Sequence, residues 1–110
     1  MPRSAVTFDI ARSIGAKLPD VTGGAGKGRM ALKIKGRILA CEAVHKSAEP
    51  NSLMVSIASK RRDALLAQNP DACYLTKHYE RHDVILVRLS RISRTSLRAL
   101  LAEAWEFVRS

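Results

Sequence analysis

The chain has 110 residues, 46% of them hydrophobic and 26% charged, and its 19 Lys and Arg against 10 Asp and Glu give a formal net charge of +9. This composition excludes a disordered acidic tail, a collagen and a disulfide-stapled miniprotein. No apolar run approaches the roughly 20 residues of a membrane span, and the N-terminus lacks the apolar core of a signal peptide. We therefore expect one cytoplasmic domain over residues 1–110, with no membrane partner. Cys41 and Cys73 each lie among apolar residues, so we expect buried free thiols.

Two periodicities divide the chain into helices and strands. Apolar residues recur every three or four positions in the predicted helices, for which Thr7, Ser59 and Ser93 are the expected N-caps. They alternate with polar residues in most predicted strands, whereas 84–89 is nearly all branched aliphatic and is expected at the centre of the sheet, covered on both faces. The predicted elements are, in chain order, a helix over 7–18, strands over 30–35, 37–44 and 53–57, a helix over 60–68, strands over 72–76 and 84–89, and a helix over 93–108. Short connections favour antiparallel pairing, so the expected fold class is α+β, a mostly antiparallel sheet of about five strands packed with helices.

Several segments resemble the MmcQ/YjbR family, and together they span nearly the whole chain. The matching segments are 18–21 (LPDV), 33–40 (KIKGRILA), 74–79 (YLTKHY), 84–89 (VILVRL) and the helix 97–108 with its Ala104-Trp105 pair. The resemblance implies a single compact α+β domain similar to type III secretion chaperones, with features described as a double-wing DNA-binding arrangement. It implies no established enzymatic activity.

Complete catalytic and metal-binding motifs are missing from the sequence. Gly26-Lys27 lacks the flanking residues of a phosphate-binding P-loop. His78 and His82 are four apart, but in a segment predicted as strand and loop, where that spacing does not bring two imidazoles onto one metal. The acidic residues near them are expected to be solvated turn residues, and His78-Tyr79 to anchor the turn before the strand at 84–89. We therefore expect no catalytic residue, no metal and no cofactor, and a protein that is not an enzyme.

Basic residues gather at three places along the sequence. Five cations fall within 27–37, where no acidic residue occurs between 21 and 41, and Lys33 and Lys35 are expected on one face of a strand. The other two groups flank predicted helix starts, where the helix dipole disfavours a cation and favours a bound anion. The predicted phosphate-contacting residues are Lys27, Arg29, Lys33, Lys35, Arg37, Lys60, Arg61, Arg62, Arg91, Arg94 and Arg98.

Two classes of function follow from these features. The first is weak, phosphate-led binding of DNA or RNA through one basic face, with little sequence specificity because aromatic residues are only 5% of the chain. The alternative is a non-enzymatic protein-interaction or small-ligand-binding module of secretion-chaperone-like fold, for which an exposed Met54 or Tyr79 would contribute to an apolar patch. The sequence leaves the oligomeric state open.

Overall fold

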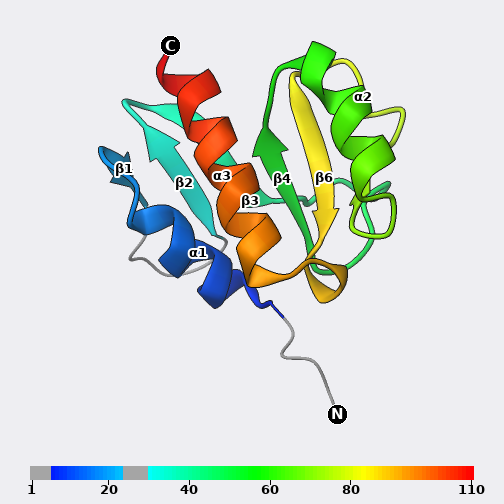
Figure 1. Cartoon of the computed structure of the whole chain (residues 1–110), viewed down its shortest axis with the longest axis horizontal. Coiled ribbons are helices and arrows are strands. Elements are labelled where there is room, and N and C mark those ends of the chain that lie inside the picture. Colours follow the sequence, from blue (N-terminus) through cyan, green and yellow to red (C-terminus); the bar gives the residue numbers. More distant parts are fainter. Residues whose placement is uncertain (1–5, 24–29) are drawn as a thin grey trace.

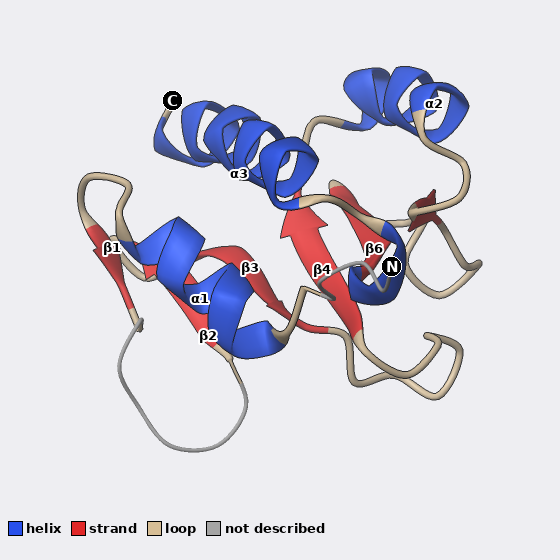
Figure 2. Cartoon of the chain, turned by 60° about the horizontal axis from the view of Figure 1, so that its bottom comes forward, coloured by secondary structure: helices blue, strands red, loops and turns tan. Residues whose placement is uncertain are grey.

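Three helices lie on one face of a six-stranded antiparallel sheet in the computed structural model, which describes residues 6–23 and 30–110 (Figures 1 and 2). The strands follow the order β1-β2-β3-β4-β6-β5 across the sheet. The elements are α1 (Phe8–Ala16), β1 (Val21–Thr22), β2 (Ala31–Ile34), β3 (Arg37–Glu42), β4 (Ser52–Ser56), α2 (Ser59–Gln68), β5 (Cys73–Tyr74), β6 (Val84–Arg88), the short 3₁₀ helix η1 (Leu89–Arg91) and α3 (Arg94–Arg109). The α+β class expected from the sequence is confirmed.

The main hydrophobic core fills the space between the helices and the sheet. Ala40, Val55 and Ile85 stand opposite one another on β3, β4 and β6, and all three are fully buried. Leu97 and Leu101 of α3 pack into the same core, because the apolar residues of that helix recur on one face. This packing fixes the sheet against α3 and leaves the opposite face of the sheet without a helix.

That opposite face has a smaller core of its own. Met54 and Leu86 are paired in register on β4 and β6 and point away from the helices, and Leu86 forms a cluster with Tyr79 and Val84. The turn at 75–83 supplies Tyr79, so it covers the β6 end of this face. Towards β3 the face stays open to solvent.

The helix boundaries confirm two predicted caps and correct a third. The Thr7 side chain accepts a hydrogen bond from the amide of Ile10, and Ser93 accepts one from Ser96. Ser59, expected as a cap, is instead the first residue of α2, and Ala58 in the cap position provides no side-chain bond. The first turn of α2 therefore has no side-chain cap, because alanine has no oxygen to offer.

The sheet differs from the sequence prediction at both edges. A sixth strand, β1, pairs with β2 through Val21 and Ile34. The segment expected at the centre, β6, lies next to the edge strand β5, yet it is buried on both faces because α2 and the 75–83 turn cover it. A position near the edge can thus be as buried as a central one.

The turn between β2 and β3 begins one residue earlier than expected. Lys35 has φ +49° and Gly36 has φ +82°, so both are left-handed, as a two-residue hairpin turn of type I′ requires. The prediction that Lys33 and Lys35 share one strand face is therefore wrong: Lys33 lies on β2 and Lys35 at the tip of the hairpin.

Among the described helices, none is long and apolar enough to cross a bilayer.

Candidate functional site

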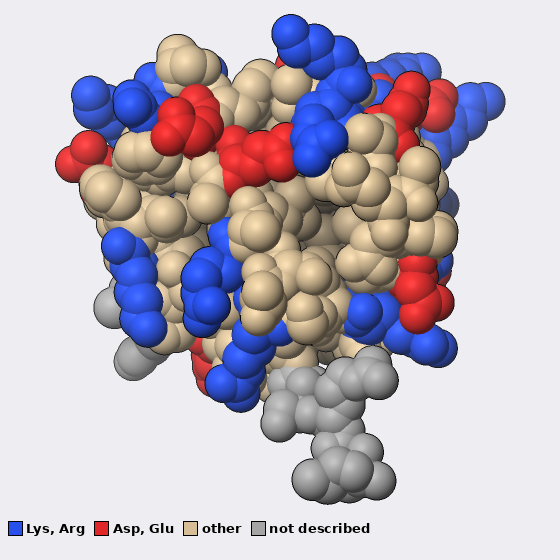
Figure 3. Space-filling view, in the orientation of Figure 1, with Lys and Arg blue, Asp and Glu red and all other residues tan. Residues whose placement is uncertain are grey.

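The predicted basic residues lie in three separate groups along the fold. They occupy the β2–β3 hairpin, the start of α2, and the stretch from η1 into α3. Figure 3 shows Lys and Arg in groups around the edge of the helical face, with acidic residues beside several of them. Two of the predicted residues, Lys27 and Arg29, fall outside the described ranges. In the described part of the chain, these residues therefore form three groups on different elements, and binding through a basic face stays a prediction.

The cations that start α2 make contacts within the protein. Arg61 Nε donates to Glu103 Oε2 of α3 at 2.6 Å. Arg62 donates to the backbone carbonyls of His82, at 2.7 Å, and Val84, at 3.2 Å. These bonds hold α2 against α3 and against the 75–83 turn. In this group, Lys60 is the residue whose side chain forms no ion pair or hydrogen bond with the described residues.

The group around the start of α3 is more open. Arg91 lies 3.8 Å from Asp71, but both side chains are largely exposed, so this pair contributes little to stability. Arg94 and Arg98 are exposed and form no ion pair with the residues that the structure describes. Along α3, Arg94 lies about 22 Å and Arg98 about 16 Å from Arg109 at the other end of the helix.

The densest group of available cations surrounds the β2–β3 hairpin. Lys33, Lys35 and Arg37 are exposed, and none of them forms an ion pair within the described ranges. Lys35 and Arg37 line a hollow of about 260 Å³ together with Arg109 and Asp20. Arg109 was not among the sequence predictions, because only the fold brings the end of α3 to the hairpin.

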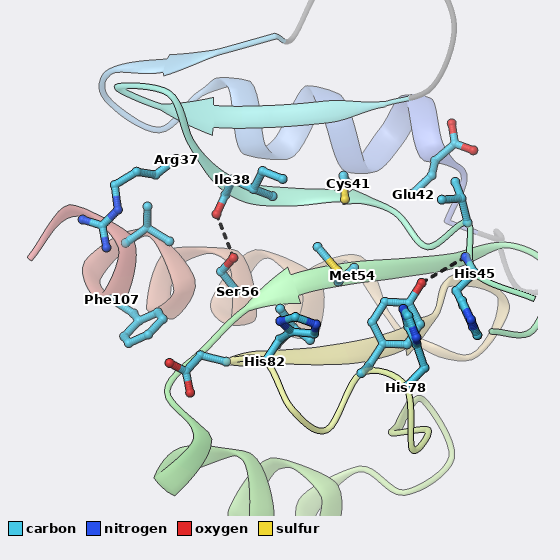
Figure 4. A pocket seen from close by; sticks show the side chains of 15 residues that line it. Arg37, Ile38, Cys41, Glu42, His45, Met54, Ser56, His78, His82 and Phe107 are labelled. Atoms are coloured by element: carbon cyan, nitrogen blue, oxygen red, sulfur yellow. Dashed lines mark hydrogen bonds between the residues drawn. The ribbon is translucent and has the colours of Figure 1, made fainter. Parts of the chain in front are cut away.

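A second candidate site is a groove of about 750 Å³ on the sheet face opposite the helices (Figure 4). Its apolar lining includes Ile38 and Cys41 of β3 and Met54 of β4. Figure 4 shows Arg37 and Phe107 at one end of this groove and His45 and His78 at the other. The lining of the groove is therefore mostly apolar, with Ser56 and His82 between its ends and the basic groups of Arg37, His45 and His78 at the ends.

The three histidines of the chain gather at one end of the groove. The rings of His45 and His78 are stacked with centroids 3.5 Å apart, and the centroid of His82 lies 6.4 Å from that of His78. Desolvation lowers the pKa of His78 below its ordinary value of 6.5, and the positive charges of His45, His82 and Arg81 lower it further. The sequence does not predict that His45 lies beside His78, because the loop at 43–51 and the turn at 75–83 meet only in the folded chain.

Tyr79 and Met54, expected to be exposed, have different environments. Tyr79 is buried, and its hydroxyl accepts a hydrogen bond from the amide of His45 at 3.1 Å, so the expectation of exposure is wrong for this residue. The contact ties the 75–83 turn to the 43–51 loop. Met54 is half-buried in the floor of the groove.

The described residues do not assemble a metal centre, and the thiols are weak nucleophiles. No cluster of three or more His, Cys, Asp or Glu able to hold a metal occurs within 6–23 and 30–110. Both cysteines are free, and burial raises the pKa of each thiol. Little thiolate therefore forms at neutral pH. Cys73 is buried as expected, whereas Cys41 is only half-buried and lines the groove.

Comparison with known proteins places the fold among solved α+β domains. The crystal structure of Deinococcus radiodurans protein DR2400, described as a DUF419 domain, matches all of this chain and 83% of its own chain, with a TM-score of 0.72 and 20% sequence identity. No family model matches the sequence, and no curated protein matches it. At 20% identity the likeness to DR2400 shows a shared fold.

Proposed function

We propose that the chain is a cytoplasmic member of the MmcQ/YjbR group and binds nucleic acid without being an enzyme. Membership is supported by the matching segments at 18–21, 33–40, 74–79 and 84–89 together with the fold shared with a DUF419 domain, which belongs to the same group. A cytoplasmic location is supported by two free thiols.

The β2–β3 hairpin is the observation that carries the nucleic-acid proposal. Lys35 lies in its tight turn, Arg37 follows as the first residue of β3, and Arg109 lines the same hollow as both, while Lys33 lies on the adjoining strand β2. A projecting hairpin can follow a groove or a backbone of the duplex, and its Lys and Arg then replace condensed counterions on the phosphates. Asp20 is the carboxylate that lines the same hollow, and it forms no ion pair with residues of the described ranges.

The proposed interface contains fewer residues than the sequence predicts. Arg61 and Arg62 are left out because their donors already bind Glu103 and backbone carbonyls. Arg94 and Arg98 form a second, separate group that a long duplex could also reach. Lys27 and Arg29 stay sequence predictions.

Binding of this kind reads the phosphate backbone more than the bases. Phe8 packs against the main core, and Trp105, which also lines the hollow beside the hairpin, already has the Arg109 guanidinium over its ring, so neither offers a free stacking platform for unpaired bases. Phosphate contacts fix position without carrying sequence information. We therefore propose duplex binding with low sequence specificity and a steep dependence on salt.

A salt titration tests the proposal. Fluorescence anisotropy would follow binding to a random-sequence DNA duplex, a single DNA strand and an RNA duplex of equal length. The account predicts a slope of log K against log salt of roughly −3 to −4 on duplex DNA, as three to four neutralised phosphates give, and weaker binding to the single strand. Affinity that is independent of salt, or no binding at about 50 mM salt, would overturn it.

A second candidate function is a ligand- or protein-binding module at the sheet face. It is favoured by Ile38 and Val44, which are 39% and 61% exposed and both line the groove. Large apolar side chains exposed together indicate a binding surface more often than single ones do. Nuclear magnetic resonance shifts on addition of an apolar ligand would test it, with shifts confined to the groove as the expected result and shifts spread over the molecule as the contradicting one.

A further inference from the structure

The groove has an apolar floor and adjoins a group of basic residues. We call this group, Lys77, His78, Arg81 and His82, the shoulder. Ile38 and Val44 are the large hydrophobic side chains that stand exposed in the described ranges, and both lie in this groove beside half-buried Met54. An adjoining hollow of about 370 Å³ is lined by Lys77, His78, Arg81 and His82. The two spaces adjoin at His78 and His82, which line both.

The shoulder contains proton donors and no carboxylate. Its four lining residues carry ammonium, guanidinium and imidazole groups, and neither Lys77 nor Arg81 forms an ion pair among the described residues. An anion placed there would receive charge-assisted hydrogen bonds from several directions. The turn at 75–83 is tied down by Tyr79 and by Arg62, so the backbone that carries these residues is held in place before any ligand arrives.

The acidic groups near the groove do not block this arrangement. Glu42 lines the groove, but its Oε2 accepts a hydrogen bond from the amide of Met30 at 2.9 Å. Asp83 lines the groove next to His82 in sequence, and Glu80 belongs to the same turn but lines neither hollow. The shoulder itself therefore keeps its positive character.

We propose that the groove binds a small amphipathic carboxylate. Its aliphatic or aromatic body lies on Ile38, Val44 and Met54, and its carboxylate lies at the shoulder, within reach of Lys77 and Arg81. The volume of about 750 Å³ falls in the range of small-molecule sites, which are mostly apolar with a few placed polar groups. This site deepens the second candidate function; Arg37 lines both the groove and the hollow beside the hairpin, whereas Lys33 and Lys35 do not line the groove.

Charge complementarity selects this occupant over a neutral or cationic one. A cation would meet Lys77 and Arg81 at the shoulder, and a neutral amphiphile would leave their charges without a partner. The ring of His78 is surrounded by His45, His82, Arg81 and the edge of Tyr79. A bound carboxylate favours the protonated form of the His78 imidazole, whose pKa is lowered in the free protein, so affinity should rise as the pH falls.

Isothermal titration calorimetry with three probes that share an eight-carbon chain tests the proposal. Octanoate should bind at least about tenfold more tightly than 1-octanol or octyltrimethylammonium. The variant Lys77→Gln/Arg81→Gln should lose about tenfold in octanoate affinity and keep its weak affinity for octanol. Val44→Ser, at an exposed position that leaves the fold intact, should weaken both.

Hairpin variants separate this site from the nucleic-acid proposal. Lys33→Gln/Lys35→Asn removes two hairpin charges outside the groove and should leave octanoate affinity unchanged while it weakens DNA binding. Equal affinity for octanoate and octyltrimethylammonium, or no octanoate binding up to about 10 mM, would overturn the carboxylate site whatever happens with DNA. Loss of octanoate affinity in the hairpin variant would overturn it as well.

Discussion

The imidazoles of His45 and His78 lie parallel, with 5° between their planes and 3.5 Å between their centroids. They come from two different loops, which also meet through the hydrogen bond from the His45 amide to the Tyr79 hydroxyl. Protonation of both rings would place two positive charges in contact. Desolvation is nevertheless the larger reason that the pKa of His78 is lowered, and the charges of His45, His82 and Arg81 add to it.

The stability of the fold should depend on pH through His78. Its pKa is lower in the folded chain than the ordinary 6.5 of an unfolded chain, so the unfolded state takes up a proton first as the pH falls. The contribution of His78 to the free energy of unfolding is therefore full above pH 6.5 and is lost as the pH falls from there to the lower folded value. Urea unfolding between about pH 8 and about pH 5 measures it.

The control for this prediction is His78→Asn, which cannot titrate in that range. The variant should have a flatter dependence of the free energy of unfolding on pH than the natural chain. If both proteins lose the same stability over the interval, the stacked pair is not the source of the dependence.

Two glycines with similar backbone angles should respond differently to alanine. Gly23 has φ +88°, and a Cβ there would lie 2.1 Å from the carbonyl oxygen of Ala31, whereas at Gly36, with φ +82°, a Cβ would meet nothing within 4 Å. Both variants carry the left-handed strain of about 1 kcal/mol, and Gly23→Ala adds a backbone clash. We expect Gly23→Ala to cost at least about 1 kcal/mol more than Gly36→Ala in urea unfolding. Equal costs would contradict the close contact between β1 and β2.

The two thiols should react at different rates. Both have a raised pKa, chiefly from desolvation, so alkylation of either should be slow at neutral pH and faster as the pH rises. Cys41 is half-buried and Cys73 buried, so iodoacetamide should modify Cys41 first, as mass spectrometry of peptides would show. Octanoate in the groove should slow the reaction of Cys41 only. Faster reaction at Cys73 would contradict the assigned burial.

Trp105 should stabilise the turn that precedes β1. Its Nε1 donates to the carbonyl oxygen of Pro19 at 2.8 Å, and the Arg109 guanidinium lies 4.6 Å from its ring centroid. Trp105→Phe keeps an aromatic ring and removes the donor, so it should cost about 1 kcal/mol or slightly more in the free energy of unfolding. A variant as stable as the natural chain would show that the hydrogen bond contributes nothing net.

The main elements were predictable because they are governed by local periodicity. The apolar stripe of α3 and the caps Thr7 and Ser93 follow from spacing and side-chain chemistry within a few residues. The strand β1 was not predictable, because two residues carry no period. The start of the turn at Lys35 was not predictable either, because Gly36 is the typical turn residue of this pair and lysine is not.

The candidate site was predictable only in part. Sequence identifies the hairpin cations, but the partners of Arg61 and Arg62 are contacts between distant segments and have no local signal. The same is true of His45 at the groove and of Arg109 at the hairpin. A count of charges therefore overestimates how many cations are available to bind a phosphate.

The central claim is that the hairpin neutralises nucleic-acid phosphates, and a salt titration with two charge-matched variants tests it most directly. The hairpin variant is Lys33→Gln/Lys35→Asn/Arg37→Gln, in which Asn suits the left-handed backbone at position 35. The matched variant Lys46→Gln/Lys77→Gln/Arg81→Gln removes the same charge at exposed positions elsewhere.

Circular dichroism would confirm that both variants fold. The account predicts that the hairpin variant flattens the slope of log K against log salt by roughly two to three, while the matched variant changes it by less than about one. Equal slopes for the two variants would contradict a hairpin interface and would mean that only net charge matters.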